Sequence, residues 1–216
     1  TVEDTASFWD AGEFIAVSSK LEVPHPPGAP FYLLLGRFFS MFAFGVPENI
    51  AIAINFLSVV SSAFTILFLF WTITYLASKI IDPRLNNDNK VLVILAGFIG
   101  SLSFTFTDSF WFSAVESEVY AMSSFFTAFV FWAILKWESL DDEKDQNKWI
   151  ILIAYMMGLS IGVHLLNLVT IPALALIIYF KKFKEVTFRG IVISLFLGLI
   201  SVGLIERARP PISFFF

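Results

Sequence analysis

The chain has 216 residues, of which 57% are hydrophobic and 15% are charged, and its mean hydropathy is +0.80. A soluble domain usually carries about a quarter charged residues. Here the apolar residues fall into long runs, which excludes an ordinary water-soluble globule and predicts an all-α polytopic membrane protein. The net charge of −4 gives no indication of a nucleic-acid partner. Because the chain has no cysteine, it has no disulfide, thiolate metal site or cysteine nucleophile.

Residues 1–46 are mixed and polar, and we expect them to form an outer loop with short interfacial helices. Asp4–Ser19 is predicted to be an amphipathic helix. Its side chains available for the membrane interface are Phe8, Trp9, Phe14 and Ile15. No regular helix is expected from Pro24 to Pro30, because prolines fix φ and remove amide donors. The apolar run from Phe31 to Phe44 is shorter than the roughly 20 residues of a span, so it is expected to lie at the interface or to tilt.

Residues 47–206 are expected to form a transmembrane helix bundle. Its apolar segments are Ile50–Ser78, Val91–Thr107, Tyr120–Trp137, Trp149–Phe180 and Ile191–Ile205. The segment Trp149–Phe180 is too long for one ordinary helix and contains Gly162, His164 and Asn167, so we expect two short helices that meet near His164. Residues 207–216 are expected to form a tail. Because the chain starts at Thr1 and stops without a domain-like end, we interpret it as part of a longer protein.

The basic residues predict the orientation of these segments. Ten of the fourteen Lys and Arg residues fall within 79–90, 136–148 and 181–189, which alternate correctly if all three segments face the cytoplasm. The outer side then gathers a set of polar residues: Asp10, Glu13, His25, Arg37, Asp108, Glu116, Glu118, His164, Asn167, Arg207 and Arg209. A functional site is therefore expected on the outer side.

Asp10 and Glu13 are three residues apart, a spacing that places two side chains on one face of a helix. Such a pair can supply a general base and a supporting carboxylate, although the solvated face of an interfacial helix has the same composition. His25 precedes Pro26 and Pro27, which bias its backbone toward an extended conformation. This segment could hold the imidazole as a partner for phosphate or a hydroxyl, or it could form an ordinary turn.

Glu116, Glu118 and Tyr120 lie at the start of a predicted span. Carboxylates suit the amino end of a helix electrostatically, and they could also form a second wall of an outer cavity. His164 and Asn167 interrupt a helix near the membrane, where polar residues either serve function or hydrogen-bond a neighbouring helix. No spacing is diagnostic of a metal site, so no cofactor is expected, although the carboxylates and histidines could bind a divalent metal. The chain has no phosphate loop, dinucleotide fingerprint or nucleophile elbow.

Four motifs occur in order along the chain: DAGEF at 10–14, HPPGAP at 25–30, FSAVESEVY at 112–120 and GLSIGVHLLN at 158–167. Together they resemble the protein-O-mannosyltransferase-like membrane family common in Bacteroidetes. They are also similar, more weakly, to the fungal and animal protein O-mannosyltransferases. Those proteins carry an adjacent acidic pair in the first outer loop, followed by a His-Pro-Pro turn, whereas Ala11 and Gly12 separate Asp10 from Glu13 here.

This resemblance implies an inverting GT-C-type glycosyltransferase that moves a sugar, mannose in this family, from a polyprenyl-phosphate donor to Ser and Thr hydroxyls of exported proteins. Asp10 would be the general base and Glu13 its partner. The residues implied in substrate binding are His25, Arg37, Glu116, Glu118, Tyr120, His164 and Asn167. The resemblance also implies a multi-pass protein of the bacterial inner membrane with its site facing the periplasm. Membrane lipid and a larger membrane assembly are further expected partners.

Two other functions remain open from the sequence. A polyprenyl-lipid transporter or flippase would use the same outer cavity, and inverted repeats would support it, but the sequence shows no such repeat. A non-catalytic membrane subunit of a larger assembly is the second alternative.

Overall fold

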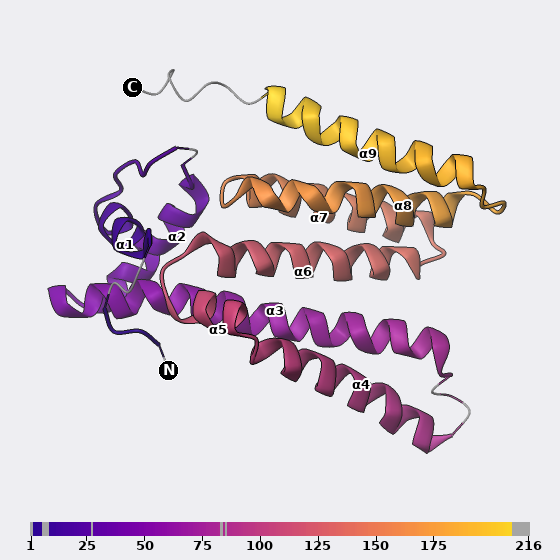
Figure 1. Ribbon diagram of the computed structural model, residues 1–216, viewed down its shortest axis with the longest axis horizontal. Helices are drawn as coiled ribbons and strands as arrows, with labels where there is room; N and C mark the ends of the chain where they lie inside the picture. The colour runs from indigo at the N-terminus through magenta and orange to yellow at the C-terminus, as the bar shows by residue number, and fades with distance from the viewer. Residues whose placement is uncertain (1, 6–8, 27, 83, 85, 209–216) are drawn as a thin grey trace.

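The computed structural model describes residues 2–5, 9–26, 28–82, 84 and 86–208. Throughout this part of the chain the regular structure is helical, and no strand occurs in it. Five of the described helical segments are long and apolar enough to cross a membrane, and they run back and forth beside one another (Figure 1). The prediction of an all-α polytopic membrane protein is confirmed.

The helices of the bundle are connected by short segments. In chain order they are α3 (Ile50–Ile80), α4 (Asn87–Thr105), α5 (Asp108–Val115), α6 (Val119–Glu138), α7 (Glu143–Ile161), α8 (Thr170–Lys182) and α9 (Phe188–Ala208). Two 3₁₀ helices, η2 (Pro47–Asn49) and η3 (Leu165–Val169), extend α3 and α8 at their amino ends. Several helices continue beyond the predicted apolar runs into polar sequence. The start of α7 shows why: the Asp142 side chain accepts hydrogen bonds from the amides of Lys144 and Asp145 and so caps the helix.

The predicted break near His164 is confirmed. Helix α7 ends at Ile161, and His164 is the N-cap residue of η3. The first of the two helices is longer than predicted, because α7 has 19 residues and begins at Glu143 rather than at Trp149. Hydropathy placed the start of this helix too late, since charged residues can occupy the first turns of a helix outside the apolar layer.

Residues 1–46 contain two short helices, α1 (Ala11–Lys20) and α2 (Pro30–Ser40), and a 3₁₀ helix, η1 (Met41–Ala43). They lie at the end of the bundle where α3 begins (Figure 1). The helix predicted over Asp4–Ser19 starts later than expected, because Trp9 adopts a left-handed φ of 54° that no right-handed helix can include. Three parts of the sequence-based predictions lie outside the described residues: Phe8, Pro27 and 209–216.

An apolar cluster holds α1 and α2 to the bundle. Phe14 of α1 and Tyr32 of α2 are buried in it together with Val119, Met122 and Val163. The amides of Phe31 and Tyr32 also donate to the carbonyl of Gly162, at 2.8 and 3.4 Å, since the first amides of a helix lack partners within the helix. Helix α2 is therefore fixed directly to the turn between α7 and α8.

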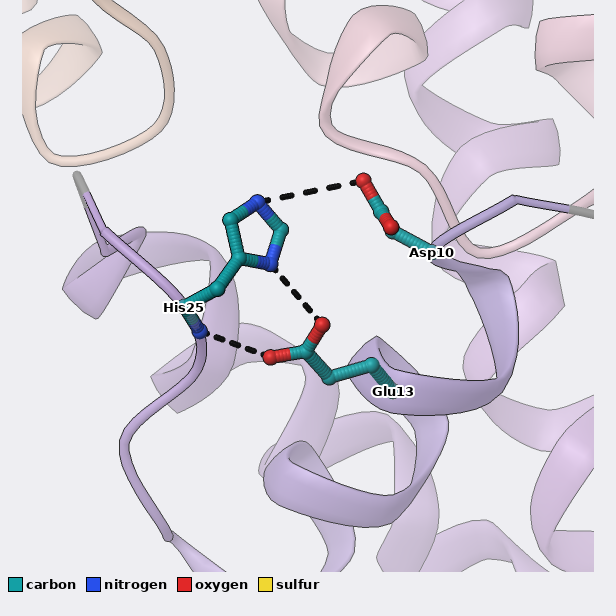
Figure 2. A group of neighbouring side chains, drawn as sticks. All are labelled: Asp10, Glu13 and His25. Carbon is teal, nitrogen blue, oxygen red and sulfur yellow. Dashed lines mark hydrogen bonds and ion pairs between the residues drawn. The ribbon is translucent and has the colours of Figure 1, made fainter.

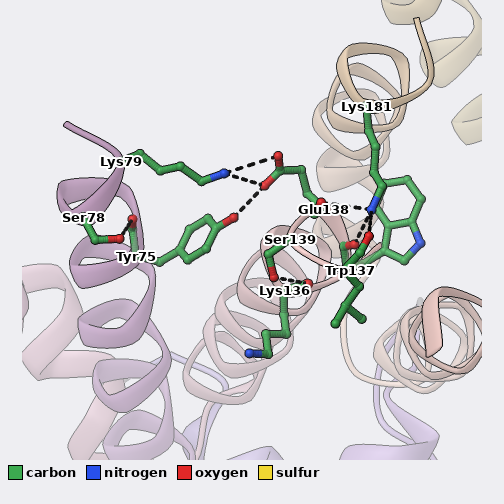
Figure 3. Close-up of polar contacts among 9 residues, drawn as sticks. Tyr75, Ser78, Lys79, Lys136, Trp137, Glu138, Ser139 and Lys181 are labelled. Atoms are coloured by element: carbon green, nitrogen blue, oxygen red, sulfur yellow. Dashed lines mark hydrogen bonds and ion pairs between the residues drawn. The ribbon is translucent and has the colours of Figure 1, made fainter. Parts of the chain in front are cut away.

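A polar cluster joins α3, α6 and α8 at the opposite end of the bundle (Figure 3). The Nζ atom of Lys181 donates to three carbonyl oxygens at 2.6 to 2.9 Å, those of Trp137, Glu138 and Leu140. The carboxylate of Glu138 pairs with Lys79 at 3.1 Å and accepts a hydrogen bond from the hydroxyl of Tyr75 at 2.6 Å. Because the last carbonyls of a helix have no partner within it, Lys181 acts as a cap on α6. The connections after α3, α6 and α8 lie at this same end (Figure 1).

Replacing Lys181 by methionine is expected to lower the free energy of unfolding by about 1–3 kcal/mol, because three carbonyls would lose their donor. Thermal unfolding of the purified protein in one fixed lipid environment would measure the loss. Lys182→Met is the matched control, since the neighbouring Lys182 is exposed. Equal loss in the two variants would contradict a capping role for Lys181.

Candidate active site

Asp10, Glu13 and His25 meet where the start of α1 faces the segment that joins α1 to α2 (Figure 2). Oε1 of Glu13 accepts a hydrogen bond from the backbone amide of His25 at 2.7 Å, and Oε2 lies 2.8 Å from the ring Nδ1. Oδ2 of Asp10 lies 3.8 Å from Nε2 of the same ring. His25 therefore lies between the two carboxylates, and it engages both oxygens of Glu13.

The contact between Glu13 and His25 favours the charged form of each group. Hydrogen bonds from the backbone amide and the ring of His25 lower the pKa of Glu13. The hydrogen bond to Glu13 in turn raises the pKa of His25, and the charges of Asp10 and Glu118 act in the same direction. Because histidine ordinarily titrates just below neutrality, the raised pKa keeps the imidazolium populated to higher pH.

Glu118 contacts Asp10 from a distant part of the chain. It directly precedes α6, is only 5% exposed, and accepts a hydrogen bond from the backbone amide of Asp10 at 3.2 Å. Burial raises the pKa of Glu118 to about 7, and the charge of Asp10 adds to this effect. Glu116 is buried two residues earlier in the chain. The site thus includes a carboxyl group that exchanges its proton near neutral pH.

The raised pKa of Glu118 predicts how stability depends on pH. Between its ordinary value near 4.5 and about 7, the folded protein holds a proton that the unfolded chain releases. The contribution of Glu118 to the free energy of unfolding is fully present below the pKa that it has in the unfolded chain. It is lost as the pH rises through the pKa that it has in the folded protein. Glu118→Gln should therefore flatten the decline of the unfolding temperature between pH 5 and 8 and be more stable than the parent at pH 8. Parallel curves of unfolding temperature against pH for the parent and the variant would contradict the raised pKa of Glu118. Glu22→Gln, at an exposed position, is the control.

A buried polar network holds the loop that carries these carboxylates. Asn55 of α3 is completely buried, and its Nδ2 donates to the carbonyls of Glu3 at 2.7 Å and Thr5 at 3.2 Å. Its Oδ1 accepts a hydrogen bond from the hydroxyl of Ser117, which lies between Glu116 and Glu118. Asn55 was not among the predicted site residues, although a polar residue inside an apolar run is the signal that would have identified it.

A small cavity of about 70 Å³ lies between His25, Glu118, Tyr120 and His164. The rings of Tyr120 and His164 are 5.5 Å apart. Nδ1 of His164 accepts a hydrogen bond from the amide of Leu166 at 3.1 Å, so the proton of the neutral ring is on Nε2. Burial lowers the pKa of His164. The two histidines therefore differ: His25 favours the imidazolium, and His164 favours a neutral ring with one donor.

Two predicted substrate-binding residues lie apart from this cavity. Arg37, in the last turn of α2, is exposed and donates to the carbonyl of Ser19 near the end of α1. Asn167 is buried, and its Oδ1 accepts hydrogen bonds from two α6 hydroxyls, those of Ser123 at 2.8 Å and Thr127 at 2.9 Å. Asn167 thereby holds the turn that carries His164. The other predicted residues do gather around one place: Asp10, Glu13, His25, Glu116, Glu118, Tyr120 and His164.

The cluster of Asp10, Glu13 and His25 could also hold a divalent cation. One ligand atom from each residue can be chosen so that all three lie within 4.8 Å of one another. Carboxylate oxygens together with an imidazole nitrogen suit several divalent metals. Binding through Nδ1 would replace the hydrogen bond between the His25 ring and Glu13, whereas binding through Nε2 would leave Nδ1–H free to donate to Glu13. The absence of a metal requirement stays a prediction.

Comparison with known proteins identifies the family of this chain. Residues 10–187 match the family described as "Protein O-mannosyl-transferase TMEM260 N-terminal domain". The chain is 27% identical over 212 residues to Protein O-mannosyl-transferase TMEM260 of Mus musculus, an alignment that covers 94% of this chain and 27% of that protein.

A second relative is Protein O-mannosyl-transferase tmem260 of Dictyostelium discoideum, which is 31% identical over 122 residues, or 55% of this chain and 13% of that protein. The chain thus spans about a quarter or less of the length of these relatives. No solved structure matches it. Because the family match covers most of the chain, the chain belongs to the family of the TMEM260 N-terminal domain.

Proposed function

We propose that this chain provides the catalytic carboxylates of a GT-C-type membrane glycosyltransferase. The enzyme transfers mannose from a polyprenyl-phosphate donor to Ser and Thr hydroxyls of exported proteins. The names of both relatives, protein O-mannosyl-transferases, support the choice of reaction. The outer cluster supports the choice of site, because its carboxylates border cavities at one end of a membrane helix bundle.

The reaction forms one bond and breaks another. The acceptor hydroxyl oxygen attacks the anomeric carbon of the sugar while a base takes the hydroxyl proton. The bond between that carbon and the phosphate oxygen breaks, and polyprenyl phosphate leaves. Attack on the face opposite the leaving group inverts the anomeric configuration. Because phosphate is a weak base, it needs hydrogen-bond donors or positive charge rather than a protonating acid.

The observation that carries the assignment is the unequal engagement of the two carboxylates. His25 engages both oxygens of Glu13, at 2.7 and 2.8 Å. Among the described residues, the contact of the Asp10 carboxylate is the longer one of 3.8 Å to His25. The Asp10 side chain is 52% exposed and borders both cavities. Asp10 is therefore the general base, and Glu13 supports it by orienting His25 and keeping it charged.

The two histidines serve the leaving group in this proposal. His25 supplies a positive charge, and His164 supplies the Nε2–H of a neutral ring. Glu118 and Tyr120 line the small cavity between them. Arg37 would act by fixing the end of α1. Asn167, as described above, holds the turn of His164.

The distribution of Lys and Arg residues supports the side of the membrane on which we place the site. Ten of the fourteen basic residues fall in the three segments expected in the cytoplasm, so the acidic cluster would face the other side. In a bacterial inner membrane that side is the periplasm, where exported proteins are available as acceptors. The donor's isoprenoid tail would lie in the surrounding lipid and against the apolar helices.

The experiment is a transfer assay with the full-length protein. The purified protein is reconstituted in lipid and given polyprenyl-phosphate mannose and a Ser/Thr-containing peptide. We expect a mannosylated peptide whose anomeric configuration, read by NMR, is opposite to that of the donor. Retention of configuration would contradict the mechanism. Failure to move sugar from any lipid donor would contradict the enzymatic function, and a lipid-flipping assay on the same preparation would then test the transporter alternative.

A further inference from the structure

A larger cavity adjoins the acidic cluster on the side of α5. Its volume is about 580 Å³, within the usual range of roughly 300–1,000 Å³ for small-molecule sites. It shares Asp10, Glu118 and Tyr120 with the small cavity described above. Its other walls come from Trp9 and from the length of α5, so it extends away from His25.

Three aromatic rings on the wall of this cavity are open to solvent. Trp9 is 88% exposed, Tyr120 49% and Phe112 45%. Trp9 is also held with φ at 54°, a conformation that is rare for a bulky residue. Aromatic rings that remain accessible inside a concave site can pack against the C–H face of a saturated ring in a ligand.

The charged groups that line this cavity in the described part of the chain are all carboxylates. Four carboxylates line the cavity: Asp10, Asp108, Glu116 and Glu118. No lysine or arginine lines it in the described part of the chain. An ionised carboxylate accepts hydrogen bonds and donates none, and Glu118 can also donate while it holds its proton. Several carboxylates together repel an anion. This cavity is therefore suited to a ligand rich in hydroxyl donors and unsuited to a phosphate.

We propose that this cavity binds the neutral sugar ring of the donor, with the ring stacked on Trp9, Phe112 or Tyr120 and its hydroxyls donating to Asp108 and Glu116. The inference rests on the proposed function, since it names the sugar subsite of that reaction. In this arrangement the neutral and the charged parts of the donor bind on different sides of Asp10. The sugar lies on the α5 side of Asp10, and the phosphate lies on the opposite side, toward His25 and His164.

Binding of a soluble probe tests the subsite without any transfer. The full-length protein is reconstituted in lipid nanodiscs free of sugar-based detergent, and methyl α-mannoside is titrated by saturation-transfer NMR. Trp9→Ala, Phe112→Ala and Asp108→Asn are each expected to weaken binding about three- to tenfold. Phe44→Ala is the matched control, because Phe44 is 86% exposed on the same outer part of the chain but does not line this cavity. Methyl α-mannoside 6-phosphate should bind more weakly than the neutral mannoside, because its phosphate would lie among the carboxylates of this cavity.

Several results would overturn the proposal. They are equal binding of the mannoside by all four variants, no detectable binding by the parent protein, or preference for the mannoside phosphorylated at C6. In the transfer assay the three cavity variants should raise KM for the donor and leave KM for the peptide unchanged. The reverse pattern would assign the cavity to the acceptor instead.

The two proposals can fail separately. If the parent transfers sugar and the cavity variants keep its donor KM, the subsite is wrong and the proposed function stands. If the mannoside binds through Trp9, Phe112 and Asp108 but no donor supports transfer, the subsite stands and the proposed function is wrong.

Discussion

Asp10→Asn is expected to lower kcat for sugar transfer by about 10²–10⁴-fold, the usual contribution of a general base. Asparagine keeps the shape of the side chain but cannot take the acceptor's proton. The variant should fold normally, because the carboxylate is half exposed and the backbone amide of Asp10 can still donate to Glu118. Initial rates at saturating donor and peptide would measure the loss, with the unfolding temperature as a check on folding.

Glu13→Gln provides the contrast with Asp10→Asn. Because Glu13 raises the pKa of His25, its loss should move the His25-dependent fall in rate to lower pH while leaving more activity than Asp10→Asn. Glu22→Gln, at an exposed position of the same segment, should change neither quantity. A parent-like rate for Asp10→Asn would remove Asp10 as the base. Loss of equal size in Glu13→Gln with an unshifted pH profile would contradict the division of roles.

Asn55→Leu is expected to lower the free energy of unfolding by about 2–4 kcal/mol, the largest stability effect that we predict. The change removes, from a fully buried position, an amide oxygen that accepts one hydrogen bond and an amide nitrogen that donates two. It leaves the Ser117 hydroxyl and the carbonyls of Glu3 and Thr5 without these partners. Activity should fall as well, because Ser117 fixes the loop between Glu116 and Glu118. Denaturant or thermal unfolding in a fixed lipid environment would measure the stability loss.

Two further variants make the Asn55 prediction specific. Asn49→Leu, at the exposed start of α3, should stay within about 0.5 kcal/mol of the parent. Ser117→Ala removes a single hydrogen bond and should cost about 1 kcal/mol, so it remains measurable if Asn55→Leu fails to fold. A loss at Asn49 as large as at Asn55 would indicate a general effect of leucine rather than loss of the network.

The membrane-spanning helices could be predicted because apolar length alone specifies them. Ile50–Ser78 became α3, Ile50–Ile80, and Tyr120–Trp137 became α6, Val119–Glu138. The interruption near His164 was also visible in the sequence, since glycine and polar residues stand where a span would otherwise be apolar. Helix ends were less predictable. Capping by a side chain such as that of Asp142 extends a helix into polar sequence that hydropathy assigns to a loop.

Most residues of the candidate site could be named from the sequence, although Asn55 was missed, but their contacts could not. The spacing of Asp10 and Glu13 suggested one helical face, yet Asp10 precedes α1. Both residues contact His25, which lies in the segment after the helix. Arg37 was expected to bind substrate, and in the structure its guanidinium donates to the carbonyl of Ser19. Such pairings depend on how the chain folds back on itself, and a pattern of local spacing does not contain that information.

The hydrogen bonds from Phe31 and Tyr32 to Gly162 have a consequence for biosynthesis. A ribosome makes α2 long before it makes the turn after α7, so the start of α2 has no carbonyl of Gly162 to donate to while the intervening helices are being inserted. His25 and His164 likewise cannot face each other until that turn exists. It follows that the contacts among Asp10, Glu13 and His25 can form early, whereas the cavity between His25 and His164 is completed only after α7 has been made.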